Sequence, residues 1–381
     1  MKRTIPILLA LCLLLGGCSK VWDGKYISVE PHQQDNNQNV MENATVGNYS
    51  ELLRLLRTMV EAGVENRTIS VAPYEQSQVD SDMQRAIDYM MQRNPFAAYA
   101  VSEITYDLGT SAGQPAVAVS INYIHDRSEL RKIQRPKNWQ QAQLAIATAL
   151  KKCEPSLVLH LSIFEGTDFA QWIANYATAN PNEVMEQPVV TVNLYPDSGT
   201  ERIVELKFTY QNTKDALLSM QTTVQRLFSA ASVYANSDDM YDRYFKLYSF
   251  LTGLSPKFQI ETSITPAYSL MQHGVGDSRA VATVYAALCA QMNLECFVVT
   301  GTRAGEPWHW NIIYVDGLHY HVDLLACNAA DEFATKHDED MTGYVWDYSS
   351  YPACVKPLPD PEPETVPTQP TEPTQPAPTE E

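Results

Sequence analysis

Three side chains in the last third of the sequence carry the functional groups of nucleophilic catalysis. Ser278 has a hydroxyl group, His309 an imidazole and Asp323 a carboxylate. In such a set the nucleophile attacks an acyl carbon, the imidazole takes up and returns its proton, and the carboxylate holds the imidazole in one tautomer. The three residues are therefore candidates for an acyl-transfer or hydrolytic site.

A helix and two strands must position these groups. An apolar stripe with helical spacing predicts a helix over 278–293 that begins at Ser278. At a helix N-terminus the backbone N–H groups favour an anionic nucleophile. Strands are expected before and after the Asp316-Gly317 turn, and they carry His309 and Asp323.

The same stretch resembles the core of a transglutaminase-like domain. That family places a Cys at the start of a helix, a His-x-Trp-Asn motif on a following strand, and an Asp on the next strand. Aligned without gaps, Ser278 takes the position of the Cys. Trp310-Asn311 matches the second motif, and the segment that ends at Asp323 keeps the third. The resemblance covers about residues 213–350 and implies a papain-like α+β fold.

The family's His position is not occupied by a histidine in this sequence. Counting back from Asn311 places Trp308 there, while His309 is one residue too close. Neighbours on a strand face opposite sides, so His309 should point away from the site. We therefore predict a domain that has lost catalysis. An active peptidase or acyltransferase with Ser278 as nucleophile is the alternative. The expected binding cleft consists of Trp308, Trp310, Asn311 and Asp277.

A metal site is a further possibility in the third motif. His319, His321 and Asp323 alternate along one strand, and such donors can suit a metal ion. The family carries a similar aromatic-Tyr-His-x-Asp segment without a metal, so we predict no metal and no cofactor. A Cys327–Cys354 disulfide is conceivable, because secretion permits disulfides.

The N-terminus resembles a bacterial lipoprotein signal. Lys2 and Arg3 precede an apolar run that ends in Gly16-Gly17-Cys18. The resemblance implies that 1–17 is removed and that Cys18 carries lipid. We expect a protein anchored on the extracellular face of the bacterial cell membrane, since the run is too short to span a bilayer.

The net charge argues against nucleic-acid partners. The formal charge is −18, and loss of Lys2 and Arg3 with the signal makes it −18 − 2 = −20. Phosphates repel such a protein.

The region between the signal and the transglutaminase-like stretch repeats itself. The order helix, strand, helix, strand, strand occurs twice, and Asn94-Pro95 and Asn180-Pro181 are 180 − 94 = 86 residues apart. We predict an α+β protein with tandem duplicated small α+β units. The expected segments are a polar tether (18–47), repeat 1 (48–125), repeat 2 (136–211), the transglutaminase-like domain (213–354) and a disordered Pro/Thr/Glu-rich tail (355–381).

Together these features predict a cell-surface lipoprotein with an inactive transglutaminase-like domain. Its expected ligand is a peptide, a wall component or a partner protein. A purely structural surface protein is the remaining alternative.

Overall fold

The computed structural model describes residues 44–356. The predicted signal, Cys18, most of the tether and nearly all of the tail lie outside this range. The described residues form two compact units, one of 44–133, 160–164 and 194–203, the other of 134–159, 165–193 and 204–356. No helix among them is long and apolar enough to cross a membrane.

The first repeat is a three-stranded antiparallel sheet with helices. Its elements are α3 (Tyr49–Ala62), β1 (Asn66–Ser70), α4 (Gln76–Arg93), α5 (Pro95–Ala100), β2 (Val101–Ser111), β3 (Gln114–Tyr123) and α6 (Arg127–Leu130), with strand order β1-β3-β2. Asn48 caps α3 by accepting from the Glu51 amide, and Gly63 ends it with φ 64°. The sequence did not predict α5, because a proline after a helical pattern normally marks only the end of a helix. In the structure Pro95 follows α4 and is also the first residue of α5. Proline is tolerated at the first helical position, where its missing N–H is not needed.

The second repeat has the same order of elements. It consists of α7 (Trp139–Lys151), β4 (Ser156–Leu161), α8 (Phe169–Ala179), β5 (Val189–Tyr195) and β6 (Arg202–Thr209). Its strand order is β4-β6-β5, so the last strand lies in the middle of the sheet, as in the first repeat. Asn138 caps α7 as Asn48 caps α3. The predicted α+β class with a duplicated unit is confirmed.

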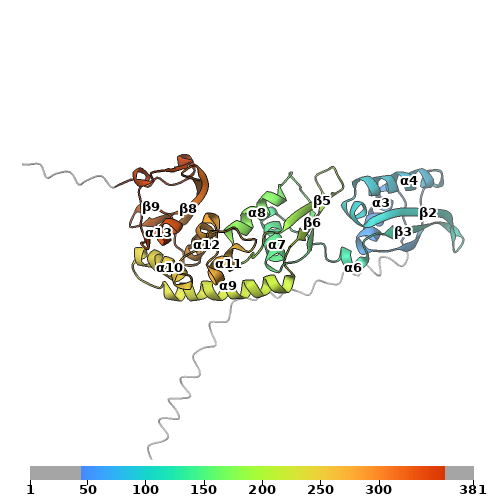
Figure 1. The fold of residues 1–381 in the computed structure, drawn as a ribbon. Helices are drawn as coiled ribbons and strands as arrows, with labels where there is room; N and C mark the ends of the chain where they lie inside the picture. The colour runs from blue at the N-terminus through green and yellow to red at the C-terminus, as the bar shows by residue number, and fades with distance from the viewer. Residues whose placement is uncertain (1–43, 357–381) are drawn as a thin grey trace, which may run out of the picture. The chain divides into compact units, whose positions relative to one another are not determined.

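Five helices and a four-stranded sheet form the C-terminal domain (Figure 1). The helices are α9 (Lys214–Tyr234), α10 (Met240–Leu254), α11 (Pro266–His273), α12 (Ser278–Gln291) and α13 (Leu324–Ala330). Helix α12 was expected to bury one stripe, but it is buried on nearly every side. It packs against β7 and β8 and against helices α9, α10, α11 and α13, so it is the centre of the domain.

The sheet of this domain is antiparallel, with strand order β10-β7-β8-β9. The strands are β7 (Cys296–Arg303), β8 (Glu306–Val315), β9 (Leu318–Val322) and β10 (Tyr344–Trp346), and short 3-10 turns span Asp338–Asp340 and Tyr348–Ser350. Gly301 leaves room for Trp310, whose Cη2 would lie 2.8 Å from an added Cβ atom. Helix α10 buries only part of its aromatic side chains, since Tyr244 and Tyr248 are buried while Tyr241 and Phe245 are exposed.

Candidate functional site

Ser278 lies at the first position of α12, where the sequence placed the nucleophile. Asp277 is the N-cap, and its Oδ1 accepts from the Ala280 amide at 2.8 Å. The Ser278 side chain is buried, and its Oγ accepts from the backbone N–H of His309 at 3.2 Å. The hydroxyl therefore serves as an acceptor for strand β8 in this arrangement.

Asp323 follows β9 and caps α13. Its Oδ1 accepts from the Ala326 amide at 3.1 Å. Its Oδ2 accepts from Trp308 Nε1 at 2.9 Å, from the Tyr344 hydroxyl at 2.6 Å and from Arg303 at 3.2 Å. Both oxygens are thus occupied by donors from within the domain.

The two candidates for the base position have different surroundings. Trp308 donates to Asp323 the hydrogen bond that an imidazole in the base position would donate. His309 contacts Ser278 only through its backbone N–H, and its buried Nδ1 has no hydrogen-bond partner among residues 44–356. Burial lowers the pKa of His309, and the positive charge of Arg279 lowers it further. The structure therefore places Trp308, and not His309, against Asp323.

Trp310 and Asn311 are core residues and do not line a cleft. Trp310 is 1% exposed and Asn311 is fully buried. The Asn311 Nδ2 donates to the Ala282 carbonyl at 3.0 Å and so ties β8 to α12. The expectation that both residues line a cleft is corrected by their burial, since Asn311 faces α12 and Trp310 packs against Tyr344 and Trp346 of β10.

The three metal-ligand candidates of the third motif take separate partners. His319 pairs with Glu295 at 2.9 Å, while His321 contacts Trp310 and Asp338. Asp323 is occupied as described above. These three side chains therefore do not assemble a common site.

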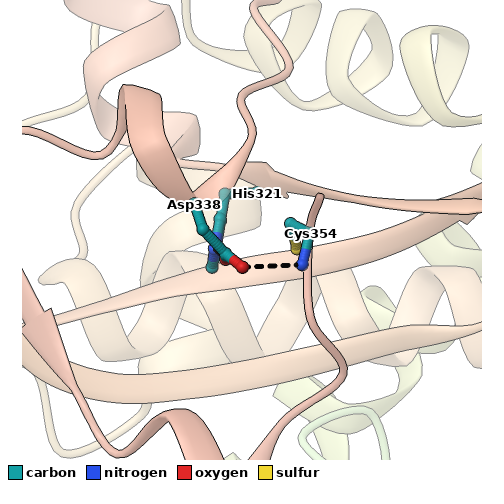
Figure 2. A group of neighbouring side chains, drawn as sticks. All are labelled: His321, Asp338 and Cys354. Carbon is teal, nitrogen blue, oxygen red and sulfur yellow. Dashed lines mark hydrogen bonds and ion pairs between the residues drawn. The ribbon is translucent and has the colours of Figure 1, made fainter. Parts of the chain in front are cut away.

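A different set of possible ligands surrounds His321. Figure 2 shows His321, Asp338 and Cys354, whose donor atoms lie within 4.8 Å of one another. An indole N–H can only donate, so Trp310 Nε1 fixes His321 Nδ1 as an acceptor at 2.9 Å. A neutral His321 then carries its proton on Nε2 and donates it to Asp338 Oδ1 at 2.8 Å. Neither ring nitrogen keeps a lone pair for a metal ion.

Cys354 is the third member of this group. Burial, reinforced by the charge of Asp338, raises the pKa of the Cys354 thiol to about 12. Its backbone N–H donates to Asp338 Oδ2 at 3.1 Å, as Figure 2 shows. The group thus anchors the last described segment onto β9. The charged sequence of 336–340 is typical of a solvated loop, but Asp338 is held in the domain by His321 and by the Cys354 backbone.

The five described cysteines are free thiols in this structure, so a Cys327–Cys354 disulfide is not formed. The Cys327 thiol lies beside Ala334, and burial raises its pKa.

A pocket of about 300 Å³ lies beside the first turn of α12, within the second unit. Of the expected cleft residues, Asp277 lines it. The other polar lining includes Thr178, Glu186 and Arg279. The Arg279 side chain donates to Thr178 Oγ1 at 2.8 Å.

Sequence reasoning missed several residues of this site. Arg303 and Tyr344 reach Asp323 because β10 pairs with β7, with Tyr344 opposite Arg303. Asp338 lies outside the strands. Arg279 follows Ser278 directly in the sequence. A positive charge beside the candidate nucleophile could have indicated that Arg279 belongs to the site.

No protein-family model matches the chain, and no curated protein sequence matches it. Among solved structures, the crystal structure of a TGase aligns with 57% of this chain at 12% identity and a TM-score of 0.24. A structure described as a candidate protease from Parabacteroides distasonis aligns with 71% of the chain at 10% identity and a TM-score of 0.20. The chain spans 63% and 43% of the lengths of these two structures. Likenesses at this level carry no argument for a shared activity.

Proposed function

We propose that the C-terminal domain is a non-catalytic, transglutaminase-like binding domain. The observation that carries this proposal is the hydrogen bond from Trp308 Nε1 to Asp323 Oδ2. Triad chemistry needs a side chain that accepts the nucleophile's proton and returns it. An indole N–H is a donor only, so Trp308 occupies the carboxylate without supplying a base.

The surroundings of Ser278 support the same proposal. A serine hydroxyl attacks well only when a base takes up its proton. Among residues 44–356 the His309 imidazole makes no hydrogen bond to Ser278 or Asp323, and the hydrogen bond between His309 and the serine uses the His309 backbone N–H. The pocket beside α12 has room for a ligand, and binding a ligand there requires no catalytic group.

A serine-directed fluorophosphonate probe tests the proposal. We expect no labelling of the wild-type protein above that of the Ser278→Ala variant. Labelling that depends on Ser278 and disappears in a His309→Gln variant would overturn the proposal and favour the peptidase or acyltransferase.

We further propose that the protein is a lipoprotein anchored through Cys18 on the extracellular face of the cell membrane. The run of residues from Lys2 to Cys18 supports this proposal. We expect wild-type protein in the membrane fraction and the Cys18→Ser variant in the soluble fraction. Equal fractionation of the two proteins would contradict the anchor.

The ligand of such a surface protein would be a peptide, a wall component or a partner protein. A pull-down with wall fragments and surface proteins tests this. Specific recovery supports binding, and recovery equal to that of an unrelated acidic protein favours a purely structural role.

A further inference from the structure

We propose that the pocket beside α12 binds a ligand through a single carboxylate group, which Arg279 holds. The inference rests on the proposed binding function and specifies its chemistry. The pocket's wall is built from α8, the segments 181–187 and 262–267, and the first turn of α12.

Most N–H donors of the Arg279 side chain have no acceptor among residues 44–356. Its guanidinium carries five N–H donors. In the described part of the chain its only side-chain hydrogen bond goes to the Thr178 hydroxyl at 2.8 Å, a neutral acceptor. Within residues 44–356 no carboxylate forms an ion pair with it. A planar guanidinium matches a carboxylate with two parallel hydrogen bonds, and this makes a carboxylate the favoured partner.

The two acidic residues of the pocket are already occupied. Glu186 is 4% exposed, and its oxygens accept from the Gln211 and Asn212 backbone amides and from the Asn212 side chain. Asp277 accepts from the Ala280 amide and from the Thr262 hydroxyl. Both carboxylates are therefore held by the protein's own donors, and Arg279 remains available to a ligand.

The α12 dipole weakens the negative charge at one end of the pocket. Asp277 sits at the positive end of the α12 dipole, which offsets part of its charge.

Size and charge restrict the ligand. A volume of about 300 Å³ lies at the small end of ligand sites and suits one or two residues of a peptide. The formal charge of −18 repels polyanions over the whole surface. The carboxylate is therefore single, and it comes either from a peptide C-terminus or from an acidic side chain.

The test uses methyl NMR of the full chain, with labelled alanines that include the pocket residues Ala177, Ala267 and Ala280. The probes are N-acetyl-Ala-Ala, its C-terminal amide, and N-acetyl-Ala-Glu amide. We expect saturable shifts of the pocket methyls, with a dissociation constant of about 1 mM, for at least one carboxylate probe. The Arg279→Gln variant should weaken binding about tenfold or more. The exposed Arg226→Gln variant removes the same charge away from the pocket and should change nothing.

The three probes separate the outcomes. Binding of N-acetyl-Ala-Ala alone identifies a chain terminus, and binding of the glutamate peptide identifies a side chain. Equal shifts with the fully amidated dialanine, no effect of Arg279→Gln, or no saturable shift up to about 20 mM would each overturn the proposal. None of these three results would contradict the proposal that the domain is non-catalytic, because that proposal is tested by fluorophosphonate labelling of Ser278.

Discussion

Replacing two residues should create a reactive thiolate, if Trp308 occupies the base position. The perturbation is the double variant Ser278→Cys/Trp308→His. The Ser278 Oγ lies 3.2 Å from the His309 amide nitrogen. The Cα of residue 308 is about 2.4 Å from that nitrogen through the peptide bond. A side chain at position 308 therefore starts within about 6 Å of the nucleophile and also reaches Asp323, which Trp308 already contacts at 2.9 Å.

The size of the effect follows from the charges involved. A free thiol has a pKa of about 8.5. In the Ser278→Cys single variant, burial and Asp277 raise the thiol pKa while the N-terminus of α12 lowers it, so we expect a value close to that of a free thiol. An imidazolium within about 4–6 Å lowers a thiol pKa by one to three units. We expect the double variant to titrate near pH 6.5, about two units lower, which corresponds to about 2.7 kcal/mol.

The assay is the pH dependence of iodoacetamide alkylation, followed by mass spectrometry on the peptide that contains position 278. The pH midpoint is the readout, because intrinsic nucleophilicity falls as the pKa falls and makes the rate itself less informative. Near-UV circular dichroism establishes that each variant is folded.

The single variants decide between the two histidine positions. If Ser278→Cys alone already titrates near pH 6.5, and adding His309→Gln returns the midpoint to about 8.5, then His309 is the partner. That result would refute the assignment of Trp308 to the base position and would support the alternative triad of Ser278, His309 and Asp323.

Three other perturbations test the surroundings of the site. Burial lowers the pKa of His321, so the folded state holds this ring neutral, while the unfolded state gains a proton as the pH falls below about 6.5. Stability should therefore be complete above that pH and decline below it in urea titrations, and His321→Asn should remove this part of the decline. Arg279→Gln should raise the pKa of His309 in an NMR titration, because Arg279 lowers it, and an unchanged value would contradict the charge assignment. Gly301→Ala should cost about 2–4 kcal/mol in urea unfolding, since the added methyl group would overlap the Val345 backbone carbonyl and the Trp310 ring, and a cost below about 0.5 kcal/mol would contradict this packing.

Local signals predicted much of this fold. Helix α12 begins at Ser278 because Asp277 is a good N-cap, and both residues lie in one short stretch of sequence. The Asp316-Gly317 turn joins β8 to β9, with φ values of 49° and 88°. The duplicated order of elements was also visible, because each helix and strand has its own period.

Interactions between distant strands were not predictable in the same way. Arg303 and Tyr344 are 41 residues apart in number (344 − 303), and only the pairing of β10 with β7 brings both to Asp323. The burial of Trp310 likewise depends on Gly301 and on β10. Asp338 reads as part of a charged loop, and its contact with His321 requires the folded chain. A single sequence holds no signal for these partners.

Asp323 has a structural role that does not depend on an imidazole. Its Oδ1 caps α13, and its Oδ2 joins β8 through Trp308, β7 through Arg303 and β10 through Tyr344. Asp323 is 7% exposed, and removing its carboxylate would leave four donors without this acceptor, namely the Ala326 amide, Trp308, Arg303 and Tyr344. Asp323→Ala should therefore destabilise the domain by about 2–4 kcal/mol, measured by urea unfolding. Asp323→Asn keeps an acceptor oxygen and should cost less. Equal stability of Asp323→Ala and the wild type would show that the Asp323 carboxylate does not stabilise the domain. A catalytic or binding role would then be the remaining explanation for an aspartate at this position.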